Sequence, residues 1–284
     1  QLAELAAKRL RSVRVRKATE LGPGIRDEVL LFNKSCFRPE VLPLVRDALP
    51  ALRRRNVCLA DPLDAVVAHS IISHFDGVIA SSLTQMDDLS ARSSKPVFLI
   101  HHHVDIRLPS HAKTWDRARL AYFGELSNTW HAESLGDRVD FISVDTRNAV
   151  DISWARHLPY YNMHYCLRRT RDIDGFKPAT KIFVAASLGA TVLVERSNEE
   201  ARRLLPKDYP YFTDTIELSQ VRRVIERAIA RFGKEEWVYA AAALAAIACY
   251  RQGPILDSIV EMMQSVTCGR GIAAGRETFG AIVD

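Results

Sequence analysis

The chain has 284 residues, of which 48% are apolar and 26% are charged, a composition of folded globular proteins that excludes disordered and collagen-like chains. Lys and Arg number 39 against 34 Asp and Glu, which gives a net charge of +5. This charge is far below that of a dedicated nucleic-acid-binding protein, and an anionic substrate or membrane surface is enough to explain it. The length favours two domains with a cleft between them.

The cysteines and the apolar runs narrow the class of protein further. Five cysteines without a CxxC spacing argue against both a disulfide framework and a zinc site, so we expect reduced thiols in a cytosolic protein. The longest uncharged apolar run, 237–250, has 14 residues, short of the roughly 20 that a membrane span needs. It is expected to be a buried helix.

The first 20 residues are expected to form an amphipathic helix, because Leu2, Leu5, Leu10 and Val13 share one stripe and the basic residues lie elsewhere. Such a helix would pack on the first domain, or it would lie on a membrane surface. No apolar core follows the basic residues, so no signal peptide is expected.

Between residues 28 and 100, short apolar runs alternate with helical patterns. Wholly apolar strands separated by helices are typical of a parallel sheet that is covered on both faces. We therefore expect an α/β, Rossmann-like domain over 1–112. Its strands are predicted at 28–32, 57–60, 77–80 and 96–100, and its helices at 38–55, 64–73 and 86–89.

The same alternation starts again after residue 117, and it predicts a second Rossmann-like domain over 113–284. From 217 to about 266 the pattern is helical, so this domain would end in a helical region. No repeat of fixed period is present, which argues against a solenoid. Strands are predicted at 120–123, 139–144, 160–167 and 191–194, and helices at 128–134, 178–188 and 198–205.

Ligands of open parallel sheets bind at the carboxyl ends of the strands, so the residues that follow each apolar run are the candidates for a site. In the first domain, His102, His103 and Asp105 are the most informative of these. Three consecutive His residues cannot all bind one metal from an extended chain, because alternate side chains point to opposite faces. His102 or His103 could act as a general base or bind a sugar hydroxyl, or all could be plain loop residues. The other candidates that follow predicted strands of the first domain are Asn33, Lys34, Asp61, Asp64, Ser81 and Ser82.

In the second domain, cations and a glycine come just before a predicted helix. Arg168 and Lys177 precede Pro178, which suits the first turn of a helix, and Thr180 and Lys181 follow it. The free N–H groups of a first turn attract anions, so this segment would bind a diphosphate. The alternative is a solvated basic loop at the end of a strand.

The run 174–194 (DGFKPATKIFVAASLGATVLV) resembles the nucleotide-sugar site of GT-B glycosyltransferases, in which a loop with Lys precedes a helix of small residues, a Gly and a strand. The runs 76–82 (DGVIASS) and 95–105 (KPVFLIHHHVD) are similar to the last strands of the acceptor-side lobe in that family. The likeness covers most of residues 28–215, and the second lobe resembles that of group 1 glycosyltransferases. It implies a fold of two Rossmann-like domains that face each other across a cleft.

The resemblance implies transfer of a sugar from a nucleotide-diphosphate sugar to a glycan, glycolipid or polysaccharide acceptor on the first domain, without a metal or another cofactor. By position, Lys181 and Arg168 would neutralise the diphosphate and Gly124 would let the backbone approach the donor. A His of 101–103 would face the sugar. Donor contacts are implied for Gly124, Arg168, Asp174, Lys177, Thr180 and Lys181, and catalysis for His102, His103 and Asp105.

One position departs from the family pattern. Asp174 matches the first acidic residue of the paired-Glu motif of retaining members, but Val184 stands where the second Glu is expected. This leaves the stereochemistry open. It also keeps two alternatives open: a nucleotide-sugar epimerase, and a protein that binds nucleotide sugars or glycans without turnover. We expect a cytoplasmic protein that could also contact the inner face of the membrane peripherally. We expect no nucleic-acid partner.

Overall fold

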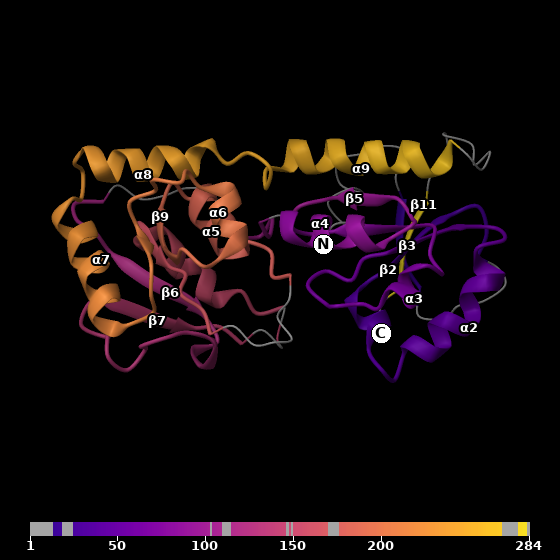
Figure 1. Cartoon of the computed structure of the whole chain (residues 1–284), viewed down its shortest axis with the longest axis horizontal. Coiled ribbons are helices and arrows are strands. Elements are labelled where there is room, and N and C mark those ends of the chain that lie inside the picture. The colour runs from indigo at the N-terminus through magenta and orange to yellow at the C-terminus, as the bar shows by residue number, and fades with distance from the viewer. Residues whose placement is uncertain are drawn as a thin grey trace. The chain divides into compact units, whose positions relative to one another are not determined.

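The computed structural model describes residues 14–18, 25–102, 104–109, 115–145, 148, 150–169, 176–268 and 278–282. The chain forms two compact units (Figure 1). The first consists of Gln1–His103, Asp172–Pro178 and Arg251–Asp284, and the second of Val104–Arg171 and Ala179–Tyr250.

The first unit is built on a sheet with the strand order β1-β11-β2-β3-β4-β5, in which all neighbouring strands are parallel. The four strands predicted in the first domain are all present, and the central three, β2, β3 and β4, are buried because helices cover both faces of the sheet. The strands are β1 (Arg14–Ala18), β2 (Val29–Phe32), β3 (Val57–Ala60), β4 (Gly77–Ala80), β5 (Val97–Leu99) and β11 (Thr278–Ile282).

Alternate residues of these strands pack on opposite faces of the sheet. On one face, Leu30 and Cys58 pack with Val45 and Leu49 of a helix that follows β2. The helices and the short 3-10 segment of this unit are η1 (Lys34–Phe37), α2 (Leu42–Leu52), α3 (His69–Ile72), α4 (Leu83–Arg92) and α9 (Gln252–Thr267).

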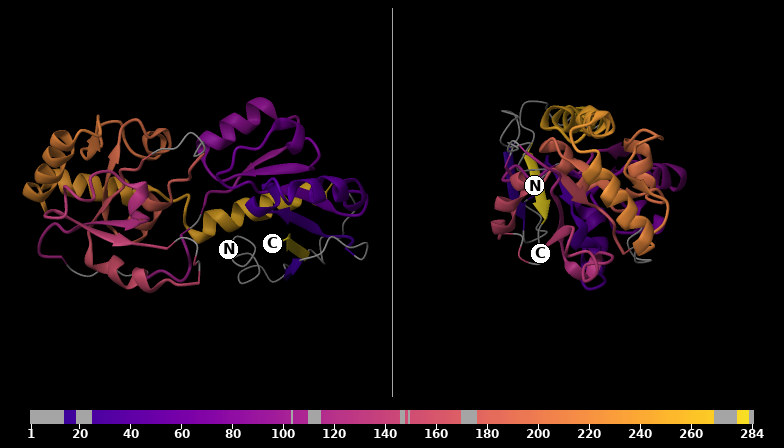
Figure 2. Two further views of the ribbon diagram at one scale, coloured as in Figure 1. Left: turned by 90° about the horizontal axis from the view of Figure 1, so that it is seen from below. Right: turned by 90° about the vertical axis from the view of Figure 1, so that its left-hand side faces the viewer.

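Helix α9 covers the opposite face of the first sheet, where Ile255 and Ile259 pack with Val29 and Leu31 (Figures 1 and 2). This packing corrects the expected division at 112/113, which placed the whole of 113–284 in one domain. The buried residues of α9 pack with residues of β2, β3 and β4, so the helix belongs to the first unit although it comes late in the chain.

The second unit has a parallel sheet with the order β10-β9-β8-β6-β7. All four predicted strands are present, together with a two-residue strand that the sequence did not reveal. The strands are β6 (Leu120–Gly124), β7 (Val139–Ser143), β8 (Met163–Tyr165), β9 (Thr191–Glu195) and β10 (Phe212–Thr213). Together the two sheets confirm the predicted α/β fold class.

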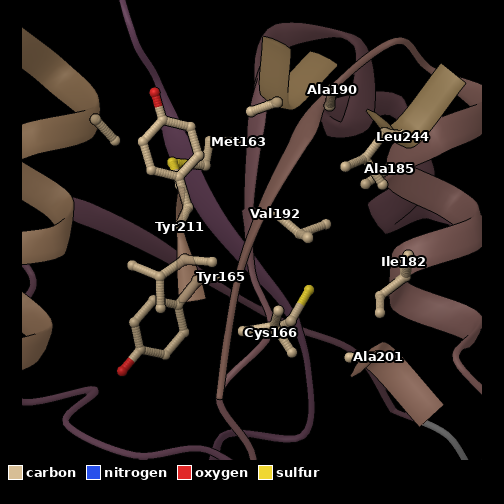
Figure 3. Close-up of a cluster of buried hydrophobic side chains, with 14 of the residues drawn as sticks. Met163, Tyr165, Cys166, Ile182, Ala185, Ala190, Val192, Ala201, Tyr211 and Leu244 are labelled. Atoms are coloured by element: carbon tan, nitrogen blue, oxygen red, sulfur yellow. The ribbon is translucent and has the colours of Figure 1, made fainter. Parts of the chain in front are cut away.

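Small and apolar side chains form the core of the second unit. Figure 3 shows Val192 of β9 with Ile182 and Ala185 of the helix that precedes it, and all three are buried. Tyr211 lies on the other side of the sheet with Met163 and Tyr165 (Figure 3). The helices and 3-10 segments are η2 (Leu126–Asn128), η3 (Ser153–Tyr160), α5 (Thr180–Ser187), α6 (Glu199–Leu204), α7 (Leu218–Ala230) and α8 (Glu235–Ala246).

Two expectations about local structure are wrong. Residues 14–18 form the strand β1, paired with β11, instead of continuing an amphipathic helix, and 1–13 lie outside the described residues. The predicted helix 128–134 is a loop, because Thr129 bridges to Arg168 and His131 has a positive φ of 61°. The region 217–266 is helical as expected, and it consists of α7, α8 and α9, with Gly233 at φ 70° between the first two.

The predicted buried helix at 237–250 corresponds to α8, in which Trp237, Ala240 and Leu244 face the core. Among the described residues, no helix is both long enough and apolar enough to cross a membrane.

Candidate functional site

Lys181 lies where helix α5 meets the carboxyl end of strand β6 in the second unit. It is on the first turn of α5, and its ammonium group donates a hydrogen bond to the carbonyl oxygen of Phe123, near the end of β6. The same nitrogen lies 4.1 Å from the centre of the Tyr122 ring, a separation at which a cation is attracted to the aromatic face. The helix N-terminus is therefore joined to the carboxyl end of β6 by one cation.

Gly124 ends β6 directly against this cation. Its φ is +157°, and a Cβ atom there would lie 2.6 Å from the Tyr122 hydroxyl and 2.8 Å from the Lys181 ammonium. Both separations are shorter than real Cβ contacts, so a side chain at this position would displace the ammonium group. The structure thus brings together Gly124 and Lys181, and the donor contacts that the resemblance implies for them stay a prediction.

Arg168 follows β8, the strand next to β6, and its charge acts on the Lys181 ammonium. Burial lowers the pKa of Lys181 to about 8, and the positive charge of Arg168 also lowers it. Burial raises the pKa of the neighbouring Cys166 thiol to about 12, so this thiol stays protonated. The cluster of Gly124, Arg168 and Lys181, called the cationic cluster below, can thus attract an anion with two side-chain charges and the free N–H groups of α5.

The loop after β6 fixes the backbone around Arg168. The Thr129 hydroxyl donates to the Leu167 carbonyl oxygen at 2.8 Å, and the Trp130 indole N–H donates to the Arg168 carbonyl oxygen at 3.1 Å. The Tyr165 hydroxyl donates to the Trp130 carbonyl oxygen at 3.1 Å. Thr129, Trp130 and Tyr122 were missed in the sequence, where no local pattern distinguishes them from ordinary core residues.

Besides Gly124 and Arg168, the structure places three of the other four residues that were expected to bind the donor. Thr180 and Lys181 begin α5, which starts two residues later than the helix predicted from Pro178. Lys177 contacts the carboxylate of Asp64 in the first unit. Asp174 lies outside the described residues. A donor role for Lys177, Thr180 and Asp174 stays a prediction.

Asp64 is only 7% exposed, and the ammonium groups of Lys34 and Lys177 both contact its carboxylate. Burial alone would raise the pKa of Asp64, but the hydrogen bonds and charges of the two lysines lower it below its ordinary value. Asp64 is therefore a carboxylate at neutral pH, and it holds Lys177 with the first unit.

The catalytic residues expected in the first domain are only partly placed. The backbone N–H of His102 donates to the Ser81 carbonyl oxygen at 3.2 Å, which puts His102 beside the carboxyl ends of β4 and β5. His103 lies outside the described residues. Asp105 belongs to the second unit, where it accepts hydrogen bonds from the Arg107 guanidinium at 2.6 to 3.1 Å. Catalysis by these three residues stays a prediction.

Val184, which stands at the position of the second Glu of the family motif, is 9% exposed in an apolar cluster with Ala155, Leu158 and Leu188. Tyr209 and Tyr211 are buried at 1% and 0% exposure, so they pack in the core of the second unit. Among the described residues, no group of three or more His, Cys, Asp or Glu side chains could hold a metal ion.

No protein-family model matches the sequence, and no curated protein has significant sequence similarity to it. Solved structures do match. The Anabaena protein HepE (Alr3699) in complex with UDP has a TM-score of 0.57 and 13% sequence identity, over 89% of this chain and 99% of HepE. Its complex with UDP-glucose has a TM-score of 0.56 and 12% identity over the same shares.

A glycosyltransferase from Rickettsia africae has a TM-score of 0.53 and 8% identity, over 84% of this chain and 76% of that one. The chain has the fold of the GT-B glycosyltransferases. In this GT-B fold, the cationic cluster belongs to the second Rossmann-like unit and His102 to the first.

Proposed function

We propose that the protein is a glycosyltransferase that moves a sugar from a nucleotide-diphosphate sugar to a glycan, glycolipid or polysaccharide acceptor. The observation that carries the proposal is the cationic cluster at the carboxyl end of the second sheet, in a fold whose solved examples include complexes of HepE with UDP and UDP-glucose. Parallel sheets bind their ligands at this end of the strands, which supports the placement of the donor there.

The chemistry of the cluster suits this reaction. When the bond between the sugar and the diphosphate breaks, the leaving nucleoside diphosphate gains negative charge. Lys181, Arg168 and the N–H groups at the start of α5 are fixed before the reaction, so they stabilise this charge without reorganising. In this proposal the protein needs no metal and no cofactor besides the donor, and the transferred sugar is a hexose.

The first unit would bind the acceptor, with His102 or His103 as the base that takes the proton of the attacking hydroxyl. A cytoplasmic role in polysaccharide synthesis, with acceptors presented at a membrane surface, is consistent with the net charge of +5.

One observation favours a second candidate function, which is binding of a nucleotide sugar without turnover. Val184 stands at the position of the second acidic residue of the family motif, and it packs in an apolar cluster with Ala155, Leu158 and Leu188. A protein of this kind would bind the donor through the same cationic cluster but would not release the nucleoside diphosphate.

Release of nucleoside diphosphate from a panel of UDP- and GDP-sugars, with and without glycan acceptors, separates these functions. We expect release by the wild type, a strong decrease in Lys181→Ala, and no change in Lys207→Ala, which removes an exposed lysine of the same unit. Donor binding without release from any sugar nucleotide would favour the binding protein. Conversion of the donor sugar without release would indicate an epimerase.

A further inference from the structure

A pocket of about 320 Å³ lies at the amino ends of β6 and β7 in the second unit. Its volume is at the lower end of the range for small-molecule sites. The strand β6 separates it from Gly124, since the pocket includes Leu120 at the start of the strand and Gly124 ends it. At about 3.3 Å per residue, the two ends are about 13 Å apart. The charged residues of the pocket are Arg117, Arg119, Arg138, Asp137 and Asp140.

The two carboxylates of the pocket already have partners. Asp137 lies 3.4 Å from the Arg138 guanidinium and 3.7 Å from that of Arg222. Asp140 accepts a hydrogen bond from the Tyr161 hydroxyl at 2.9 Å. In the part of the chain that the structure describes, no carboxylate forms an ion pair with the guanidinium of Arg117 or Arg119, and the three arginines and two aspartates give the pocket a net charge of +1.

The backbone that carries these two arginines is held in place. Asn162 is 1% exposed. Its side-chain amide N–H donates a hydrogen bond to the Arg117 carbonyl oxygen at 2.9 Å, and its side-chain oxygen accepts one from the backbone N–H of Arg119 at 2.8 Å. The Trp115 indole N–H donates to the Pro159 carbonyl oxygen at 3.2 Å. Arg117 and Arg119 come just before β6, and both line the pocket.

We propose that Arg117 and Arg119 bind a phosphate group in this pocket, which we call the arginine pocket. Guanidinium groups bind phosphate oxygens with paired, charge-assisted hydrogen bonds, and a fixed backbone reduces the entropy lost on binding. The phosphate would belong to a free anion or to a lipid headgroup. This site is separate from the cationic cluster, and it does not depend on the proposed donor.

Titration with inorganic phosphate tests the proposal in a Lys181→Ala background, in which phosphate binding at the cationic cluster is weakened. We expect that Arg117→Ala and Arg119→Ala each weaken phosphate binding about tenfold or more, the effect of losing a hydrogen bond to a charged group. The control Arg202→Ala, which removes an exposed arginine of the same unit outside the pocket, should bind as tightly as its parent.

Asp137→Asn gives a result in the opposite direction, which a folding defect would not produce. It removes a negative charge from the pocket and releases Arg138 and Arg222, so phosphate binding should tighten a few-fold. Equal binding by the parent, Arg117→Ala, Arg119→Ala and Asp137→Asn would overturn the proposal, and so would a parent that binds no phosphate in any form.

Vesicle binding distinguishes the source of the phosphate. Retention on phosphatidylcholine vesicles that contain phosphatidic acid, but not on pure phosphatidylcholine, would identify a lipid headgroup if Arg117→Ala and Arg119→Ala abolish it. Binding of inorganic phosphate without retention on vesicles would identify a free anion. UDP binding by Arg117→Ala should equal that of the wild type, so a failure of the donor site and a failure of the arginine pocket give different results.

Discussion

The Lys181 ammonium donates a hydrogen bond to the carbonyl oxygen of Phe123, 58 positions earlier in the chain. This contact joins the first turn of α5 to the end of β6 and leaves the charge of Lys181 beside the backbone of Gly124. A cation that is already oriented by the protein can stabilise a leaving diphosphate at little further cost, so this pair of residues is central to the proposed donor site.

The pH dependence of donor binding should follow the charge of Lys181. Because burial lowers its pKa to about 8, Lys181 loses its proton as the pH rises above this value in the free protein. The dissociation constant of UDP, measured by calorimetry, should therefore rise above pH 8 by up to about tenfold per pH unit. Lys181→Arg, which stays charged at these pH values, should show no such rise. The same rise in both proteins would contradict the assignment.

Replacement of Gly124 by Ala should weaken UDP binding and lower the free energy of unfolding by about 1 to 3 kcal/mol, the cost of one strained backbone position. The new Cβ would approach the Lys181 ammonium to 2.8 Å, and the end of this flexible side chain would move away. Gly136→Ala is the matched control, because a Cβ there meets nothing within 4 Å. Similar UDP affinities for both variants would show that the ammonium need not stay at Gly124.

His164 should make the second unit less stable in mild acid. It is 3% exposed, and burial lowers its pKa to about 3, with a further decrease from the charge of Lys181. Between about pH 6.5 and 3 the unfolded chain binds a proton that the folded chain does not, so stability falls as the pH falls through this range.

Denaturant unfolding of His164→Leu at pH 7 and pH 5 measures this contribution. Between these two pH values, the free energy of unfolding should fall by about 2 kcal/mol more in the wild type than in the variant. This value follows from about 1.4 kcal/mol per pH unit over the range from about pH 6.5 to pH 5. Equal losses would mean that the His164 imidazole takes up a proton without unfolding.

His102→Ala should reduce the rate of sugar transfer and leave UDP binding unchanged, because His102 lies at the carboxyl end of the first sheet and the donor is proposed to bind the second. Loss of a general base lowers the rate by about 10²- to 10⁴-fold. Initial rates at saturating donor provide the measurement. Full activity of both His102→Ala and His103→Ala would show that neither histidine is the general base.

The strands β2 to β4 could be predicted because they are buried on both faces, and such strands are short continuous apolar runs in the sequence. The strand β11 could not, because it pairs with β1 and β2 from the other end of the chain. Periodicity suggested a helix at 128–134, but hydrogen bonds of Thr129 and Trp130 to the segment after β8 determine a loop there.

In the candidate site, too, local sequence predicts some residues, and contacts with distant parts of the chain determine the others. Lys181 and Gly124 could be found because one follows a Pro before a helix and the other ends an apolar run. The contribution of Tyr122 depends on which face of β6 meets α5, and this is decided by strand pairing rather than by local sequence. Lys177 pairs with Asp64, 113 positions away, which no spacing rule could indicate.

Calorimetric titration with UDP of the wild type, Lys181→Ala and Arg168→Ala is the most direct test of the cationic cluster as a diphosphate site. We expect saturable binding by the wild type, and a loss of affinity of tenfold or more in each variant, about the value of a hydrogen bond to a charged group. Lys207→Ala should bind as the wild type does. Equal affinities in all four proteins would contradict the assignment of the donor site to Lys181 and Arg168.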